Sequence, residues 1–324
     1  MTTITSTEQL RQVVQAAGLA PSVHNTQPWR FLARPDRLEL HAEPTRRLQV
    51  LDPDGRQLHL SCGAALFHAR AAARALGLDV AVELLPDSST PDHLADLVLT
   101  AGAAPSEDDI RLAAAILHRH TFRGTFDDRP LPEALIERLR LDAESESALL
   151  HEVSRSEDVL ELEVLLSRAD AEQEHDEPYR RELAQWVPNG ETMPDGIPAT
   201  ALATAAGSSL RQRDFTLSHA AATDGSAPAA DHPAVFVLAT VDDDPASWLR
   251  AGQALAAVVL RAADHGVQAQ PLGQVTDVLA YRLRLRAVLG LVSRPQLVLR
   301  MGYATSRAAT PRRVVDDILG RVAV

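Results

Sequence analysis

Apolar residues recur along this chain at two spacings, which alternate. A spacing of three and four residues predicts helices over about residues 6–18, 58–76, 106–118, 245–265 and 275–289, with two more beginning near Pro132 and Ser156. Short apolar runs predict strands over residues 29–33, 38–41, 80–85, 97–99, 234–240 and 296–301. Each half of the chain follows the order helix, short strands, long Ala-rich helix, strand. We therefore expect an α+β fold of two halves, each a mixed sheet covered by helices.

Several local signals mark where these elements begin and end. Ser6 and Gln9 form a capping-box pattern before the first helix, and Gly18 is suited to end it. Pro35 and Asp36 predict the turn of a hairpin between the first two strands.

The segment from about residue 187 to residue 233 lacks periodicity and is rich in Pro, Gly, Ser and Ala. A connection of this length is unusual inside a compact domain. It predicts either a lid over a functional site or a partly disordered segment.

The loop over residues 20–31, A-P-S-V-H-N-T-Q-P-W-R-F, lies between a predicted helix and a predicted strand. Pro21 and Pro28 stiffen its ends, and the residues between them are dense in hydrogen-bonding groups. Such a loop indicates a cofactor site. An ordinary connection with an Asx turn at Asn25 explains the same residues.

The net charge of the chain limits the kinds of partner that we expect it to bind. The chain has 44 acidic and 32 basic residues, a net charge of −12, which argues against nucleic acid or an anionic membrane as a partner. Every basic residue is Arg, so an anionic ligand would be held by guanidinium groups, which suit phosphate well.

Cys62 is the one cysteine, so an internal disulfide is excluded and no thiol cluster exists for a metal. We expect it to be a small buried residue. His118 and His120 lack the acidic or thiol neighbours of a metal site, and none is expected. With no signal-peptide pattern and no apolar run of membrane-spanning length, the protein is expected to be cytoplasmic.

The pattern P-S-x-x-N-x-Q-P-W in the loop resembles the nitroreductase family of FMN-dependent oxidoreductases. That family carries an R-x-S/T-x-R/K segment near the N-terminus, whereas here the similar segment, R-H-T-F-R, lies at residues 119–123. The chain therefore resembles two nitroreductase halves fused in tandem, residues 1–105 and 106–324, as in the Acg-type branch. Residues 52–56 and 61–66 also resemble that branch, and the resemblance is weakest over residues 143–233.

This resemblance implies an FMN site with NADH or NADPH as co-substrate. It implies flavin contacts from Pro21, Ser22, Asn25 and Gln27, and phosphate contacts from Arg119, Thr121, Arg312 and Arg313, with His120 a further cofactor-binding residue. It also implies a cation near the N1/O2 edge of the ring from Arg123, and contacts near N5 from Pro271, Leu272 and Gly273. No catalytic side chain is implied, because the flavin carries the chemistry. From the residues alone, a solvated helix-end cluster facing Asp127 and Asp128 is the favoured explanation of the arginines at 119 and 123.

The resemblance implies hydride transfer from NAD(P)H to the flavin and on to a small-molecule acceptor such as a nitroaromatic or quinone. An FMN-binding or storage protein with a covered flavin is the alternative, and a structural relic without cofactor a weaker one. The chain holds one P-S-x-x-N loop and one arginine segment, which predicts one FMN per chain and a monomer with an internal pseudo-dimer interface.

Overall fold

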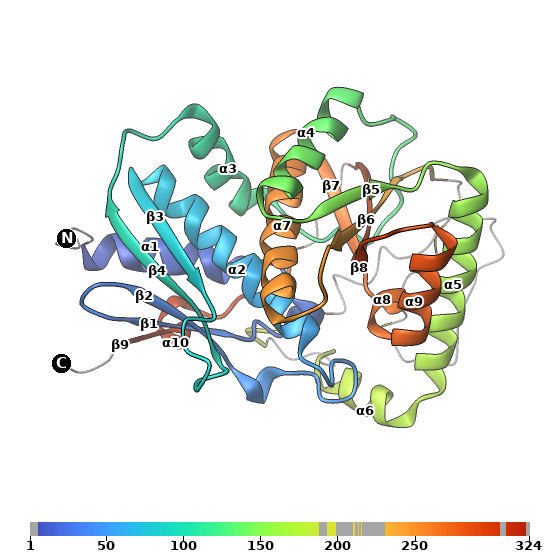
Figure 1. Ribbon diagram of the computed structural model, residues 1–324, viewed down its shortest axis with the longest axis horizontal. Helices are drawn as coiled ribbons and strands as arrows, with labels where there is room; N and C mark the ends of the chain where they lie inside the picture. Colours follow the sequence, from blue (N-terminus) through green and yellow to red (C-terminus); the bar gives the residue numbers. More distant parts are fainter. Residues whose placement is uncertain are drawn as a thin grey trace.

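Two β-sheets lie on either side of a central pair of long helices, α2 (Arg56–Ala75) and α7 (Pro245–Asp264) (Figure 1). The computed structural model describes residues 6–187, 193–198, 210, 213, 215, 231–304 and 309–321. The α+β class with two sheets is confirmed, and the hairpin predicted through Pro35 is present as an antiparallel pair of strands.

The first sheet is mixed and has the strand order β3-β4-β2-β1-β9. Its strands are β1 (Trp29–Ala33), β2 (Leu38–Ala42), β3 (Leu78–Leu84), β4 (His93–Ala101) and β9 (Leu319–Arg321), and it packs with α1 (Thr7–Gly18), α2, α3 (Glu107–His118) and α10 (Val315–Ile318). β9 pairs parallel with β1, and the other pairs are antiparallel. Residues from the predicted second half thus supply an edge strand to the sheet of the first half.

The second sheet is antiparallel throughout, with the order β5-β6-β8-β7. Its strands are β5 (Leu149–Glu152), β6 (Ala234–Thr240), β7 (Val267–Leu272) and β8 (Arg294–Tyr303). The helices of this part are α4 (Glu133–Ser145), α5 (Ser156–His175), α6 (Glu177–Gln185), α7, α8 (Gln274–Asp277) and α9 (Leu279–Val288). Apolar residues of α4 and α7 pack in one core cluster with this sheet, and those of α5, α8 and α9 pack in a second.

The central helices cross at very short range because each carries a glycine at the crossing. A Cβ atom built on Gly63 would lie 2.1 Å from the carbonyl oxygen of Leu249, and one built on Gly252 would lie 2.1 Å from that of Leu60. Only glycine fits at such distances from a neighbouring backbone. The two halves are therefore joined by close helix packing as well as by the chain.

Most predicted elements are present, and their ends follow the predicted caps. The side chains of Ser6 and Gln9 form the capping box that begins α1. The helix predicted over residues 275–289 is wrong as one element, because Val278 takes an extended conformation (φ −92°, ψ 113°) and separates α8 from α9. The sequence patterns did not predict β5, β7 or α6.

Two further predictions can be compared with the structure. Cys62 is fully buried, and burial raises the pKa of its thiol. The segment predicted as a lid over residues 187–233 falls largely outside the described residues, which include only Val187, residues 193–198, Leu210, Arg213, Phe215 and residues 231–233 of it.

In the described part of the chain, no helix combines the length and apolar character needed to cross a bilayer.

Candidate functional site

The loop after α1 makes a tight 3₁₀ turn, Val23–Asn25, and holds an unusual backbone conformation. His24, Asn25 and Gln27 have positive φ values of 46°, 56° and 48°. Residues other than glycine rarely take this conformation, and a group of them in one loop is typical of functional sites. The hydroxyl of Ser22 accepts a hydrogen bond from the Gln27 amide at 3.0 Å, which closes the loop on itself.

Asn25 and Gln27 use their side chains to hold neighbouring segments. Asn25 Nδ2 donates to the carbonyl oxygens of Gly196 at 2.9 Å and Pro311 at 3.0 Å. Gln27 Nε2 donates to the carbonyl oxygen of Pro194 at 2.9 Å. Neither residue lines the pockets described below. The structure therefore places these two predicted flavin contacts behind the loop, where they fix its shape.

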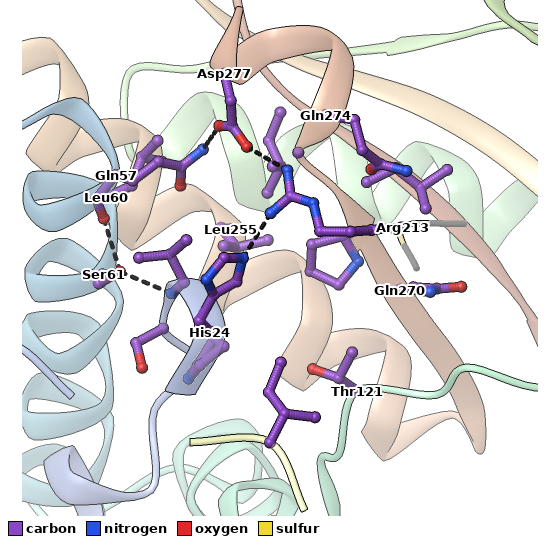
Figure 2. A pocket seen from close by; sticks show the side chains of 18 of the residues that line it. His24, Gln57, Leu60, Ser61, Thr121, Arg213, Leu255, Gln270, Gln274 and Asp277 are labelled. Atoms are coloured by element: carbon purple, nitrogen blue, oxygen red, sulfur yellow. Dashed lines mark hydrogen bonds and ion pairs between the residues drawn. The ribbon is translucent and has the colours of Figure 1, made fainter. Parts of the chain in front are cut away.

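A pocket enclosing about 790 Å³ of space, its open mouth included, lies beside this loop (Figure 2). Both halves of the chain line it. From the first half come Pro21, Ser22, Val23, His24, Gln57, Leu60 and Ser61, and from the second come Thr121, Arg123, Ile197, Arg213, Phe215, Leu255, Gln270, Pro271, Leu272, Gly273, Gln274, Asp277 and Leu297. Seven predicted site residues are thereby brought together: Pro21, Ser22, Thr121, Arg123, Pro271, Leu272 and Gly273.

A second, narrower pocket adjoins the first and shares four lining residues with it: Pro21, Thr121, Leu255 and Pro271. Arg119 and His120 line this second pocket. The bridge between Thr121 and Ala269 of β7 holds the arginine segment beside the strand. The two pockets together form an elongated site that runs from Arg119 to Asp277.

Arg119 is buried at one end of this site, and Arg312, which lines neither pocket, is close enough for its charge to act on Arg119. Burial lowers the pKa of Arg119 to about 9, assisted by the positive charge of Arg312, and burial lowers the pKa of Arg312 to about 10. Arg119 donates to the carbonyl oxygen of Leu19 at 3.2 Å, and Arg312 to Oδ1 of Asn25 at 2.9 Å. Among the described residues neither forms an ion pair with a carboxylate, and the Nε atom of each has no hydrogen-bond partner. Such a pair of buried cations favours an anionic ligand.

The other two predicted arginines differ in their surroundings. Arg123 lines the larger pocket and is partly buried. Desolvation lowers its pKa to about 10, and its guanidinium lies 5.4 Å from the ring centroid of Phe215. Arg313 pairs with Glu43 at 2.5 Å and donates to the carbonyl oxygen of Gln27 at 3.2 Å. The structure thus brings Arg123 into the site and leaves both Arg312 and Arg313 outside the two pockets.

The residues that form the polar wall of the larger pocket were not predicted as site residues from the sequence. These are His24, Gln57, Arg213 and Asp277, which are joined by hydrogen bonds (Figure 2). His24 lies in the loop that the sequence pattern had marked, and Gln57 follows the Asp52–Arg56 segment. Arg213 and Asp277 stand in no recognisable motif, so only the fold brings them to the pocket.

A separate cluster on the first sheet contains Glu39, His41 and His93, whose potential ligand atoms lie within 4.8 Å of one another. Arg34 and Arg37 both donate to Oε1 of Glu39 at 2.9 Å, and His41 lies 3.1 Å from Oε2. The two imidazole rings stack with an interplanar angle of 11°. Parallel rings do not direct their nitrogen lone pairs at one shared ion, so this cluster is better explained as an ion-paired network.

Comparisons with known proteins agree on one family. The family model described as "Nitroreductase family" matches residues 2–51 and 116–303. A Mycobacterium tuberculosis protein named "Putative NAD(P)H nitroreductase Rv3131" is 34% identical over 318 residues, which cover 96% of this chain and 91% of the relative. Another from the same organism, "Putative NAD(P)H nitroreductase acg", is 33% identical over 323 residues, covering 98% of this chain and 96% of the relative. A Desulfitobacterium hafniense nitroreductase structure with bound FMN covers 66% of this chain and 98% of its own, with 14% identity and a TM-score of 0.42.

Proposed function

Because this chain belongs to the nitroreductase family of oxidoreductases, we propose that it binds one FMN in the elongated site and transfers hydride from NADH or NADPH to a small-molecule acceptor. One observation carries this proposal. Arg119, on which the charge of the nearby Arg312 acts, lines one end of a site whose other end is a pocket lined by both halves.

The arginine end fits the phosphate of FMN. A phosphate dianion beside Arg119 would supply the negative charge that Arg119 and the nearby Arg312 lack among their described neighbours. Thr121 contributes a hydroxyl that can also donate to a phosphate oxygen. Binding would remove the cost of holding two like charges in a buried site.

The larger pocket fits the flavin ring. Pro21 and Ser22 of the loop line it together with Pro271, Leu272 and Gly273 at the end of β7. Gly273 follows β7 directly, and a Cβ atom there would lie 2.8 Å from Oδ2 of Asp277, so glycine keeps this wall open. Arg123 supplies a cation at the pocket, and a cation beside the ring stabilises its reduced, negatively charged form.

When bound, FMN supplies the chemistry by accepting a hydride from NAD(P)H and passing it to the acceptor. The residues of this chain hold the reactants in position, neutralise charge and limit the access of water. We assign no side chain as a general acid or base. Nitroaromatics and quinones are the acceptor classes proposed.

We also propose one site per chain and a monomer. The loop with Pro21 and Ser22 and the segment with Thr121 and Arg123 meet within a single chain. A complementary site would need a second arginine segment and a second P-S-x-x-N loop, and residues 1–324 contain one copy of each. Fusion makes the contact between halves intramolecular, which raises its effective concentration to roughly millimolar.

Flavin titration tests this proposal directly. We expect the purified chain to retain one equivalent of FMN per 35.0 kDa after desalting, and anaerobic NADPH or NADH to bleach the flavin absorbance. Sedimentation should give a monomer. A colourless protein after reconstitution, two equivalents of FMN, or FMN shared between two chains would each contradict it.

The alternative of a flavin-binding or storage protein is supported by one feature. Arg213 and Phe215 line the same pocket and contact His24, so part of the space beside the proposed ring position is already filled. Bound FMN that neither NADH nor NADPH reduces would favour storage. Bleaching within the mixing time, followed by reoxidation by a quinone, would favour the oxidoreductase.

A further inference from the structure

Arg300 of β8 is fully buried, and its guanidinium reaches three acceptors on three different parts of the chain. Nε donates at 2.5 Å to Oε1 of Gln270, its cross-strand neighbour on β7, which lines the larger pocket (Figure 2). One terminal nitrogen donates to Oδ2 of Asp231 at 3.0 Å, and the other donates to the carbonyl oxygen of Gly124. The guanidinium also lies over the ring of Phe126, 4.7 Å from its centroid. Arg300 therefore connects the second sheet to the chain that follows the arginine segment.

The connection over residues 119–132 has no helix or strand of its own, so tertiary contacts must set its shape. Arg123 stands in it between two fixed points. Before it, the amide of Phe122 donates to a carbonyl oxygen of β7 at 3.0 Å. After it, the carbonyl oxygen of Gly124 accepts from Arg300. The backbone is thus held on both sides of the residue whose side chain lines the larger pocket.

The ion pair between Arg300 and Asp231 holds the same connection at a further point. Both side chains have no exposed surface, and the carboxylate oxygen that pairs with Arg300 also accepts from the amide of Phe126 at 3.3 Å. A buried ion pair adds little stability over apolar residues of similar volume, because desolvation offsets the attraction. Apolar residues could not bond to the carbonyl oxygen of Gly124 or to the amide of Phe126. The pair is therefore better explained by the position that it gives the backbone than by a gain in stability.

The position of Arg123 matters because the interaction between two charges weakens with their separation. A cation that moves away from the flavin ring stabilises the reduced, anionic form less. A residue that holds the backbone of Arg123 in place therefore acts on the bound flavin, although it lines neither pocket itself.

We infer that Arg300 is a positioning residue for Arg123, acting through its hydrogen bond to the carbonyl oxygen of Gly124. Gln270 and Asp231 orient the guanidinium for this contact. The inference rests on the proposed function for its consequence, which is that Arg300 contributes to the reduction potential of bound FMN without touching it.

Arg300→Lys separates position from charge. It keeps the positive charge beside Asp231, but an ammonium group lacks the planar fork that reaches three acceptors together. In the FMN-reconstituted protein, we expect the ratio of the affinities for reduced and oxidised FMN to fall about 10-fold, which lowers the potential by about 30 mV. Anaerobic titration against a reference dye measures the potential. In the Arg123→Ala background the same substitution should change this ratio by less than about 2-fold, because its effect passes through Arg123.

Deuterium exchange on the flavin-free chain gives a second measurement, which does not depend on the cofactor. The amides of residues 122–127 should exchange about 10-fold faster in Arg300→Lys than in the natural protein, because their backbone is less firmly held.

Arg261→Lys is the matched control. Arg261 is also a buried fork, with bonds of 2.5 and 2.8 Å to Asp108 and one of 2.8 Å to Asp142, and it lines neither pocket. It should leave the potential and the exchange of residues 122–127 unchanged.

If Arg300→Lys does not fold, as judged by circular dichroism, Phe126→Leu provides the second variant. It removes the ring beneath the guanidinium and leaves every charge in place. It should shift the potential and the exchange in the same directions as Arg300→Lys.

An unchanged potential in the folded variant, an equal shift in the Arg123→Ala background, or unchanged exchange of residues 122–127 would each overturn the inference. Its failure can be told apart from that of the proposed function. Flavin content is measured first by absorbance, and a natural protein that binds no FMN contradicts the proposed function. The exchange measurement on the flavin-free chain then decides by itself whether Arg300 holds the backbone of Arg123.

Discussion

Gly63 of α2 and Gly252 of α7 are in direct contact at the centre of the molecule. A Cβ atom on Gly252 would lie 2.9 Å from the Cα atom of Gly63 and 2.1 Å from the carbonyl oxygen of Leu60. Since backbone atoms on both sides would have to move, the helix pair tolerates no larger residue at this crossing.

We expect Gly63→Ala and Gly252→Ala each to lower the free energy of unfolding by about 2 kcal/mol or more, because overpacking outweighs the roughly 1 kcal/mol gain in helix propensity. Urea unfolding measures the change. Arg74→Ala, an exposed position in the last turn of α2, is the control and should change stability by no more than about 0.5 kcal/mol. A glycine variant as stable as this control would show that the helices can separate at little cost.

Arg119→Ala should weaken FMN binding by about 1.5 to 3 kcal/mol, the cost of losing a charge-assisted hydrogen bond to phosphate. Riboflavin has no phosphate, so its affinity should be unchanged. Quenching of flavin fluorescence measures the affinities for FMN and for riboflavin. Arg111 is an exposed residue of α3, and Arg111→Ala is the control. If riboflavin binding falls as much as FMN binding, Arg119 does not act on the phosphate.

Arg123→Ala should lower the reduction potential of bound FMN, because a partly buried cation at the pocket favours the reduced, anionic ring. Each 1.4 kcal/mol of lost interaction corresponds to about 30 mV for a two-electron couple. The potential is measured by anaerobic titration against a reference dye. An unchanged potential combined with a loss of FMN affinity like that of Arg119→Ala would reassign Arg123 to the phosphate.

His68 should make folding sensitive to mild acid. It is fully buried, and burial with the nearby charge of Arg119 lowers its pKa from 6.5 to about 3. The unfolded chain therefore binds a proton between these pH values that the folded chain does not, and stability falls as the pH drops from 6.5 towards 3, by up to about 1.4 kcal/mol per pH unit.

Between pH 6.5 and 5, His68→Gln should reduce the slope of the free energy of unfolding against pH. The reduction should be at most the slope that one bound proton causes, about 1.4 kcal/mol per pH unit, and urea unfolding at each pH measures it. The exposed His175, changed to Gln, is the control and should leave the slope unaltered. The same slope in His68→Gln and in the natural protein would mean that other buried histidines, such as His24, carry the whole effect.

Local sequence predicted much of this fold, because the signals for its helices and for the first hairpin are local. The Ser6 capping box and the turn through Pro35 both act within a few residues. The patterns missed β5, whose four residues, Leu149–Glu152, are too few to show a period. They also missed the break at Val278, where tertiary packing overrides a helical pattern.

The candidate site was likewise predicted only in part from the sequence. The loop from Pro21 and the segment from Arg119 were recognised from their motifs, and the structure brings residues of both to one site. Arg213 and Asp277 lie 64 positions apart and meet only in three dimensions. Asn25 shows the converse, since a motif residue expected at the flavin holds Gly196 and Pro311 in place.

The pairing of β9 with β1 has a consequence for synthesis on the ribosome. β9 follows every other described element, yet it forms an edge of the sheet that contains the earliest strands. Arg312, which precedes it, donates to Asn25 in the loop after α1. Since a chain emerges N-terminus first, the first sheet and its loop must wait for almost the entire polypeptide before they are complete. We therefore expect a nascent chain stalled before residue 309 to be unable to capture the cofactor, whatever helices it has already formed.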